Sequence, residues 1–524
     1  MNARGSRSSG LCSDANAGFY DSEHADIDWR PTTMLISRWI VLAFLALMAQ
    51  APTPQFRSGI DIVRFDVVVV DKARHPVAGL TAADFHVSEN GKPLRIAGFE
   101  SVTIPGPAAG GDPTSGDAGA TETVSNERRV PRRLVVILFD RTIGYEWPVV
   151  NARAVANAAI DALGPNDLAA VMFTPGLAAG RPQGFTANRA RLRAAVASMV
   201  MGTPTEYSMS FEGLKPSGMN LSPGESLCGL ATVETLTNVS DSLATIDGVQ
   251  KMILFIGGDV TLSEQSAQAR APECRGRMTE PYARLFRAVD RANVTVHAID
   301  PRGLDTQGTM ADNTPPEDPD DRMTRQNSLG ALPAYTGGRV IAATNEPVKM
   351  VPGLFEESRS YYVLAIEREP ARGQGQPHGV KIDVGRKDVT VLSRRAYFDA
   401  APVTARKAAA DPLERAIGEL LPHPDLPLTM TLRPAGRRGA GTVEVTLATP
   451  RSSPARAEVL VAVFDSFAKR VGGERATVEL PARSGSNVEW KMHLNPKPGH
   501  YEIRAAVRIG AQIGSIIGYV DVPK

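Results

Sequence analysis

The residue with the clearest chemical potential is Asp140, which directly follows the apolar run Leu134–Phe139. A buried strand that ends on an aspartate places a carboxylate at its carboxyl-terminal tip. Carboxylate oxygens are ligands for hard cations such as Mg²⁺ and Ca²⁺. The same carboxylate can instead cap the next turn or accept backbone N–H bonds. The sequence therefore leaves two interpretations of Asp140, a cation ligand or a framework residue.

Motifs for other chemistry are missing from the sequence. None of the eight histidines has the spacing of H-E-x-x-H, and there is no G-x-S-x-G, P-loop or G-x-G-x-x-G. His297 lies inside an apolar strand pattern, which favours a core histidine over a catalytic one. We therefore expect a protein that is not an enzyme.

The chain of 524 residues carries a formal net charge of +1, so no global field favours nucleic acid as a partner. From Met34 the sequence reads "MLISRWIVLAFLALMAQAPTP", with one arginine, an apolar run and an A-x-A pattern typical of a secretory signal peptide. The run is about half of the roughly 20 residues that span a bilayer. We expect a leader and signal peptide over residues 1–51, a true start at Met34, and an exported mature chain without an integral membrane segment. Its destination is periplasmic, cell-surface or secreted.

Export affects how the cysteines are interpreted. Cys12 is lost with the leader, which leaves Cys228 and Cys274 in an oxidising compartment. A disulfide between them would close a loop of about 47 residues and stabilise the fold by about 4 kcal/mol. Two unpaired buried thiols are the alternative.

The pattern of the chain predicts several domains. Alternating apolar residues and the turn signal "ENGK" (Glu89–Lys92) predict a small β module over residues 52–105. Residues 106–130 are rich in glycine, proline and small polar residues, which predicts a flexible linker. Strands alternating with helices predict an α/β domain over 131–365, followed by a β extension and linker over 366–410 and a β-sandwich over 411–524.

Within residues 131–365 we expect strands at 134–139, 167–173, 251–259 and 294–300, and helices at 189–200, 227–246, 281–292 and 348–357. This order predicts a doubly wound, mostly parallel sheet with ligands at the carboxyl ends of its strands. Asp300 ends the last of these strands, and we interpret it as a turn and capping residue.

The chain contains a series of short stretches whose order resembles the von Willebrand factor type A-related exported proteins of Acidobacteria and their relatives. The series begins with "DVVVVDKARHPVAGLTAADFHVSENGKP" and continues with "VVILFD", "GPNDLAAVMFT", "GFTANRARLRAAV", "VTVHAIDPRG", "TGGRV", "SYYVLAIE" and "RRAYF". The resemblance covers most of residues 56–398. It implies a von Willebrand A-like fold with a six-stranded sheet and helices on both faces. The role of that family is poorly defined, so the resemblance implies architecture more than activity.

Metal-binding members of this fold hold a divalent cation with a D-x-S-x-S loop, a threonine from a second loop and an aspartate after a later strand. Asp140 matches the first position of the loop, and Thr142 can replace the first serine. Gly144 stands at the second serine and offers no side-chain oxygen.

The second loop reads "MGTPTEY", so Thr203 or Thr205 could supply the threonine. After the later strand, "FIGGD" has glycine at the usual position of the aspartate, with Asp259 one residue further on. We therefore expect a degenerate adhesion site, with a bound Mg²⁺ or Ca²⁺ as the alternative.

These observations favour an exported, non-enzymatic adhesion or assembly protein that binds an unidentified protein ligand. A metal-dependent hydrolase that uses Asp140 and Asp259 is one alternative. A purely structural envelope component is another.

Overall fold

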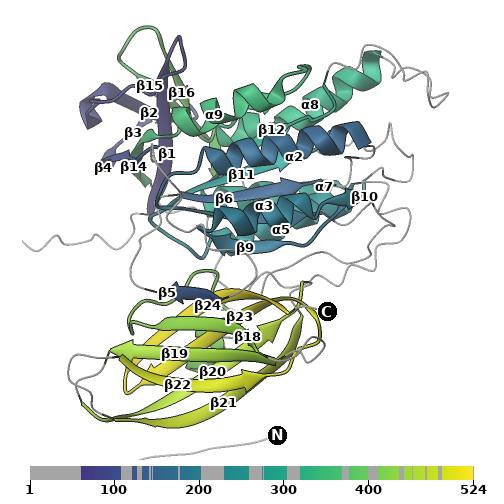
Figure 1. Ribbon diagram of the computed structural model, residues 1–524. Helices are drawn as coiled ribbons and strands as arrows, with labels where there is room; N and C mark the ends of the chain where they lie inside the picture. Colours follow the sequence, from purple (N-terminus) through teal and green to yellow (C-terminus); the bar gives the residue numbers. More distant parts are fainter. Residues whose placement is uncertain are drawn as a thin grey trace, which may run out of the picture. The chain divides into compact units, whose positions relative to one another are not determined.

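The computed structural model describes residues 61–107, 121–126, 133–140, 143, 146–174, 178–201, 229–258, 274, 276–303, 319–368, 377–398, 411–435, 442–450, 453–466, 469–481 and 487–522. Figure 1 shows the elements that these residues form. The predicted leader and signal peptide lie outside them.

The N-terminal module is built from two parts of the chain that are far apart in sequence. Its strands are β1 (Asp61–Asp71), β2 (Phe85–Glu89), β3 (Lys92–Leu94), β4 (Ile96–Thr103), β14 (Ser360–Arg368), β15 (Pro377–Val384), β16 (Val389–Leu392) and β17 (Ala396–Phe398). They form two antiparallel sheets, in the orders β16-β1-β14-β4 and β17-β15-β2-β3. Residues beyond 359, which we assigned partly to the α/β domain and partly to a separate extension, therefore complete this module.

The sequence signals for the N-terminal module are confirmed in detail. Phe65, Val67 and Val69 alternate along β1 and are fully buried in the core between the two sheets. Asn90 and Gly91 both adopt positive φ between the paired residues Glu89 and Lys92, which is the backbone that a two-residue hairpin turn requires.

The central module contains a six-stranded sheet in the order β13-β12-β11-β6-β7-β9. Its strands are β6 (Arg133–Phe139), β7 (Asp167–Phe173), β9 (Gln183–Thr186), β11 (Gln250–Ile256), β12 (Val294–Ile299) and β13 (Val340–Ile341). Two further two-residue strands, β8 (Ala178–Ala179) and β10 (Val200–Met201), pair with each other. Neighbouring strands of the six-stranded sheet are parallel except at the edge, where β9 is antiparallel to β7.

Helices cover both faces of the six-stranded sheet (Figure 1). They are α2 (Glu146–Asp161), α3 (Arg189–Ala197), α5 (Leu230–Leu243), α7 (Thr279–Ala292), α8 (Pro319–Thr336) and α9 (Pro347–Glu357). Every residue of β6 is buried, and the side chains from Leu134 to Phe139 alternate between two cores. Leu138 packs in the core that includes residues of α5 and α7, and Phe139 packs in the core that includes residues of α2 and α9.

The C-terminal module is a sandwich of two antiparallel sheets, in the orders β22-β19-β18-β5 and β21-β20-β23-β24, around one shared core. Its strands are β18 (Thr429–Ala435), β19 (Thr442–Pro450), β20 (Ala455–Phe464), β21 (Arg470–Leu480), β22 (Asn487–Leu494), β23 (Gly499–Ile509), β24 (Gln512–Val522) and β5 (Glu122–Ser125). The short helix α10 (Pro412–Ile417) packs on β20 and β23. Strand β5 comes from the segment that we predicted as a linker, so the sandwich is not made by residues 411–524 alone.

The predicted fold class, a doubly wound and mostly parallel von Willebrand A-like α/β fold, is wrong for this chain. Five of the six sheets in the described ranges are antiparallel, and parallel pairing is confined to the central sheet. The flanking segments supply most of the strands, and their alternation of buried and exposed residues is typical of antiparallel sheets with one solvated face. We gave too much weight to the strand and helix repeats between residues 131 and 365.

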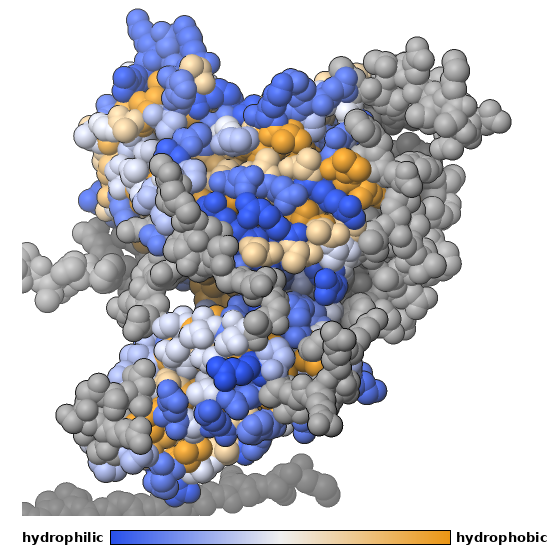
Figure 2. All heavy atoms as spheres, in the orientation of Figure 1, coloured by the Kyte–Doolittle hydropathy of each residue, from blue (hydrophilic) through white to orange (hydrophobic). Residues whose placement is uncertain are grey.

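The described surface exposes few large apolar side chains. The face drawn in Figure 2 is mostly blue and white, with small separate orange areas. The large hydrophobic residues that are exposed belong to different elements: Ile62, Val150, Met323, Val340, Met350 and Val471. Scattered residues of this kind do not indicate a binding surface.

Candidate functional site

Four parallel strands of the central sheet end at the same level. Phe139 of β6 pairs with Phe173 of β7 and with Ile256 of β11, and Ile256 pairs in turn with Ile299 of β12. The next residue of each strand therefore lies in one row along the carboxyl edge of the sheet. This carboxyl-edge row consists of Asp140, Thr174, Gly257 and Asp300. In open sheets with parallel strands, ligands bind outside this edge.

Backbone hydrogen bonds continue the sheet through the row. The amides of Asp140, Thr174 and Gly257 donate to the carbonyl oxygens of the last residues of neighbouring strands at 2.9 Å. The amide of Asp300 donates to Ile341 at 2.8 Å. The side chains of the row are therefore positioned by the sheet itself.

The carboxylate of Asp140 is fully buried and is used inside the protein. Its Oδ1 accepts a hydrogen bond from Thr174 Oγ1 at 2.9 Å and another from Thr232 Oγ1 at 2.6 Å. Thr174 follows β7, and Thr232 lies in the first turn of α5, so Asp140 ties two other elements to the tip of β6. These contacts support the framework interpretation of this residue.

Two consecutive glycines follow β11 where a cation site would need an acidic residue. An ideal Cβ on Gly257 would lie 2.6 Å from Cβ of Asp140, and one on Gly258 would lie 2.3 Å from Cζ of Arg302. Real Cβ atoms do not approach other atoms this closely. An aspartate at either position therefore requires Asp140 or Arg302 to move.

Arg302 brings a guanidinium to this edge. Its Nη2 donates to the carbonyl oxygen of Gly258 at 2.7 Å, and its Nε donates to Oδ1 of Asp300 at 3.0 Å. Asp300 also accepts from the backbone amide of Arg302 at 3.0 Å, which closes the turn that the sequence predicts. The side chain of Arg302 is 30% exposed, so part of this positive charge faces solvent. A fixed cation beside Gly258 opposes the binding of a second, divalent cation there.

The remaining predicted ligands come from segments that the structure does not describe. Thr142, Thr203, Thr205 and Asp259 lie outside the described residues. Gly144 does so as well. Within the described part of the chain, no group of three or more histidine, cysteine, aspartate or glutamate residues is arranged to hold a metal ion.

Sequence reasoning missed three residues of this site. Thr174 carried a usable signal, because it follows its strand as Asp140 follows β6. Arg302 belongs to the quoted motif "IDPRG", but nothing in the sequence places its side chain over Gly258. Thr232 sits inside a helix pattern, where no local signal points to the tip of a distant strand.

The structure describes two further residues that we singled out. Cys274 is fully buried and disulfide-bonded, and its predicted partner Cys228 lies outside the described residues. His297 is buried in β12, and its Nδ1 accepts a hydrogen bond from the backbone amide of Arg339 at 3.1 Å. Burial, with help from nearby arginines, lowers the pKa of His297 to about 3. A neutral core histidine agrees with our interpretation.

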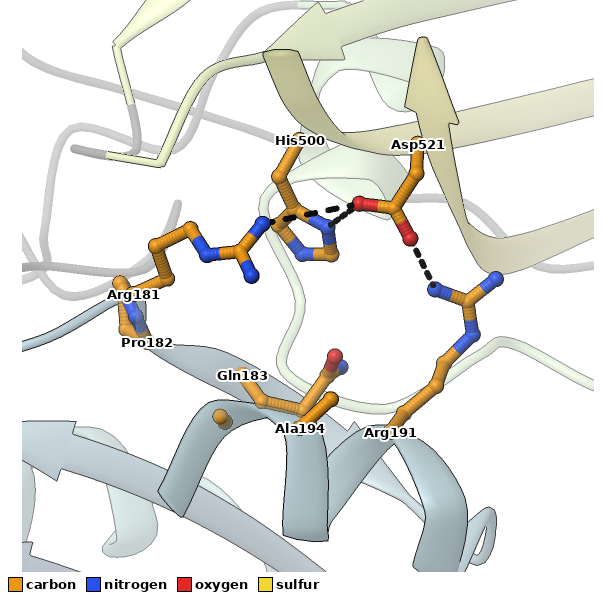
Figure 3. A pocket seen from close by; sticks show the side chains of 8 residues that line it. Arg181, Pro182, Gln183, Arg191, Ala194, His500 and Asp521 are labelled. Atoms are coloured by element: carbon orange, nitrogen blue, oxygen red, sulfur yellow. Dashed lines mark hydrogen bonds and ion pairs between the residues drawn. The ribbon is translucent and has the colours of Figure 1, made fainter. Parts of the chain in front are cut away.

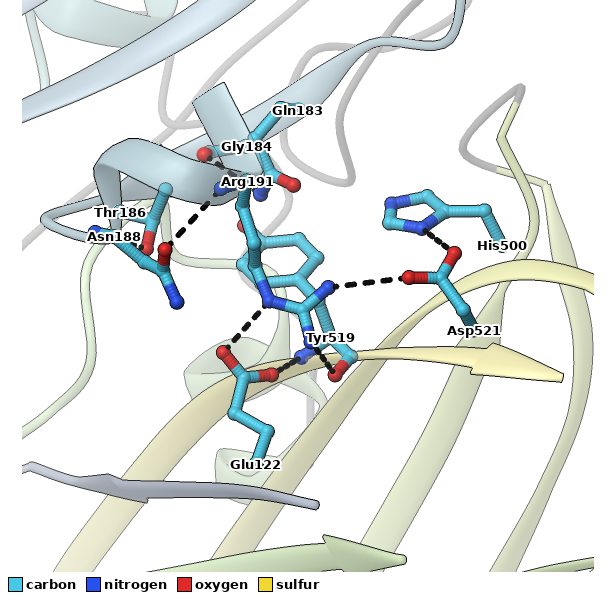
Figure 4. A network of polar contacts seen from close by, with 9 residues as sticks. All are labelled: Glu122, Gln183, Gly184, Thr186, Asn188, Arg191, His500, Tyr519 and Asp521. Carbon is cyan, nitrogen blue, oxygen red and sulfur yellow. Dashed lines mark hydrogen bonds and ion pairs between the residues drawn. The ribbon is translucent and has the colours of Figure 1, made fainter. Parts of the chain in front are cut away.

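A second polar site joins the central and C-terminal modules (Figure 4). Arg191 of α3 donates from Nε to Glu122 Oε1 at 3.0 Å and from Nη2 to the carbonyl oxygen of Tyr519 at 2.8 Å. Glu122 Oε2 accepts from the amide of Tyr519 at 2.6 Å. Arg191 also lies 3.7 Å from Asp521, and His500 Nδ1 lies 2.9 Å from the other oxygen of that carboxylate. This network connects α3 to β5, β23 and β24.

A small cavity of about 40 Å³ opens beside this network (Figure 3). Arg181, Arg191 and His500 surround the carboxylate of Asp521, while Ala194 of α3 forms part of the opposite wall. His500 and the arginines hold the pKa of Asp521 below its usual value, against the opposing effect of burial. Because Asp521 already supplies the negative charge, the cavity is not a clear anion site.

Comparisons with known proteins give no family. No family model and no curated protein matches the chain. Solved structures match only weakly. The three N-terminal domains of the type V pili tip protein Mfa5 from Porphyromonas gingivalis align over 82% of this chain and 78% of that chain, with 10% identity and a TM-score of 0.22. A putative beta-galactosidase from Bacteroides fragilis aligns over 31% of this chain and 23% of that chain, with 9% identity and a TM-score of 0.15.

Latent PorU from Porphyromonas gingivalis aligns over 31% of this chain and 14% of that chain, with 18% identity and a TM-score of 0.15. The alignments to the galactosidase and to PorU span less than a quarter of those chains. At such TM-scores none of the matches supports a fold or a function. The resemblance to von Willebrand factor type A-related proteins stays a prediction.

None of the described helices has both the length and the apolar character that crossing a membrane requires.

Proposed function

We propose that this protein is an exported, non-enzymatic binding or assembly protein that contacts a protein partner through the carboxyl edge of its central sheet, without a bridging divalent cation. The contact of Arg302 with Gly258 carries this proposal. A guanidinium occupies the space that an acidic cation ligand would need, and it is partly open to solvent.

The use of Asp140 supports the same proposal. A carboxylate that bridges a cation to a partner must present oxygen atoms to the ion. Here one oxygen accepts hydrogen bonds from two threonine hydroxyls within the protein, and the side chain is fully buried. Its role is then to hold β6, β7 and α5 in place beneath the contact surface.

Arg302 suits direct recognition of an acidic partner. A guanidinium binds carboxylates through paired N–H donors, and arginine is enriched at protein interfaces. Asp300 and Gly258 accept from Nε and Nη2 and fix the orientation of the group. A carboxylate of the partner would then approach Arg302 from solvent.

The experiment is affinity capture with the mature protein from the extracytoplasmic fraction of the source organism, with and without EDTA. We expect a specific partner whose capture is unchanged by EDTA and is reduced at least tenfold by Arg302→Gln. Arg291→Gln is the matched control, because Arg291 of α7 forms an exposed ion pair with Asp241 of α5. Capture that EDTA abolishes, or that Arg302→Gln leaves intact, would contradict the proposal.

The two alternative functions predict other results. A metal-dependent hydrolase would show an activity that EDTA removes, and a structural spacer would capture no partner in either condition.

A further inference from the structure

A small cavity lies at the opposite, amino-terminal edge of the central sheet, where the N-terminal module meets the central module. Its volume is about 10 Å³. Asp66 of β1 and Arg394, between β16 and β17, line it from the N-terminal module. Asp290 of α7 and Tyr335 of α8 line it from the central module.

Three residues that line this cavity each carry a buried polar atom without a hydrogen-bond partner among the described residues: Asp66 Oδ1, Tyr335 Oη and Arg394 Nε. Nε of Arg64 lies 3.6 Å from Asp66 Oδ1, which is too long for a hydrogen bond. A buried donor or acceptor without a hydrogen-bond partner destabilises the folded protein. Three such atoms around one cavity point to a missing shared partner.

Two of the groups that carry these atoms, Arg394 and Tyr335, are fixed by their other contacts. Arg394 donates from Nη1 to the carbonyl oxygen of Asp290 at 2.8 Å and to its carboxylate, and its Cζ lies 4.4 Å from the centre of the Phe65 ring. The ring of Tyr335 packs edge-on against Phe286 with centroids 4.8 Å apart. Neither side chain is therefore free to turn toward another partner.

The chemistry of the three atoms selects the ligand. Arg394 Nε is only a donor, Asp66 Oδ1 as a carboxylate is only an acceptor, and the Tyr335 hydroxyl is both. A cation cannot accept from Nε, and an anion cannot donate to Oδ1. Water can do both, and a volume of about 10 Å³ for a water-sized sphere is the least that holds one molecule.

We propose that this cavity binds one ordered water molecule that accepts from Arg394 Nε, donates to Asp66 Oδ1 and contacts the Tyr335 hydroxyl. The water completes the connection between the two modules. Burial raises the pKa of Asp66 and of the Tyr335 hydroxyl, as expected for polar groups held away from bulk solvent.

Tyr335→Phe distinguishes an occupied cavity from an empty one. If water is bound, the variant loses a hydrogen bond, and its melting temperature falls. If the cavity is empty, the variant removes an unsatisfied hydroxyl, and its melting temperature stays the same or rises. The ring contact with Phe286 is kept in both cases.

Tyr362→Phe is the matched control. The Tyr362 hydroxyl donates to the carbonyl oxygen of Val77 at 2.7 Å and accepts from the amide of Leu80 at 3.1 Å, so its loss must lower the melting temperature. We expect Tyr335→Phe to lower the melting temperature in the same direction. An unchanged or raised value would overturn the proposal.

A crystal structure of the mature protein at high resolution provides the direct observation. We expect a density peak of one water within hydrogen-bond distance of Asp66 Oδ1 and Arg394 Nε. An empty cavity, or a peak with the coordination of a metal ion, would overturn the proposal.

Discussion

The hydroxyl of Thr232 donates a 2.6 Å hydrogen bond to Oδ1 of Asp140, although the two residues are 92 positions apart. This bond fastens the first turn of α5 to the tip of β6. It also occupies an oxygen that a cation site at this position would use.

We predict that Thr232→Val destabilises the protein by about 1.5–3 kcal/mol, because it removes a hydrogen bond to a buried carboxylate while keeping the shape of the side chain. Thr232→Ser keeps the hydroxyl and should recover most of this loss. Urea unfolding followed by tryptophan fluorescence measures both variants. Equal stability of Thr232→Val and the parent protein would show that the bond is not structural.

The sequence predicts many elements of the central module well because they are regular, but it misses α8 and the edge strand β9. β7 occupies the predicted residues 167–173, and β12 ends one residue before the predicted 300. Buried strands and amphipathic helices leave strong local patterns, whatever the rest of the chain does.

The arrangement of the modules could not be predicted in the same way. β14 pairs with β1 across about 300 residues, and β5 pairs with β18 across a similar distance. Such pairs depend on matching edges, which no local pattern encodes. Asp140 was recognised as a candidate because the local strand pattern ends on it. Thr232 and Arg302, whose contacts support a role without a cation for this edge, were missed because those contacts depend on the tertiary fold.

His297 makes the protein sensitive to acid. Its pKa is about 3 in the folded protein and about 6.5 when unfolded, so the unfolded chain binds the extra proton between these values. The contribution of neutral His297 to the free energy of unfolding is therefore fully present above pH 6.5. It is lost as the pH is lowered toward 3, by several kcal/mol at most. The dominant cause is burial, and Arg339, Arg133 and Arg74 add to it.

His297→Asn tests this sensitivity, because asparagine can still accept the bond from Arg339 but does not titrate. We expect a smaller loss of melting temperature between pH 6.5 and pH 4 than in the parent protein. The same pH dependence in both proteins would assign the acid sensitivity to other groups.

Lys251 makes the stability of the protein depend on pH in the alkaline range. It is buried at the start of β11, where its Nζ donates to the carbonyl oxygen of Ala292 at 2.9 Å. Burial lowers its pKa to about 8, against about 10.5 in the unfolded chain. The unfolded chain then binds more protons between pH 8 and pH 10.5, so the Lys251 contribution makes stability rise with pH across this window.

Lys251→Met should remove this contribution. We expect the difference in unfolding free energy between parent and variant to change by about 3 kcal/mol between pH 7.5 and pH 10.5, in favour of the parent at high pH. Chemical denaturation at the two pH values measures it. If the difference in unfolding free energy between parent and variant does not depend on pH, Lys251 is not a source of the pH dependence of stability.

The junction of the central and C-terminal modules depends on Arg191. Its side chain is 8% exposed and that of Glu122 is 12% exposed, so removing one partner leaves a buried charge. We predict that Arg191→Met costs about 3–5 kcal/mol. Burial raises the pKa of Glu122 despite the contact with Arg191, which means that the pair does not fully offset the burial of the carboxylate.

Glu122→Gln should therefore cost much less, and the double variant should be more stable than Arg191→Met alone. A double-mutant cycle with urea unfolding measures the coupling. Additive effects of the two substitutions would mean that the pair is not coupled.

The central claim is that the carboxyl edge of the central sheet works by contact and without a divalent cation. Calorimetric titration of Mg²⁺ and Ca²⁺ into the mature protein, together with thermal unfolding in each ion, tests it most directly. We predict no saturable heat and no rise in melting temperature at millimolar Mg²⁺, for the parent protein and for Asp140→Asn alike. Saturable binding with a raised melting temperature in the parent, and loss of both in Asp140→Asn, would contradict the account.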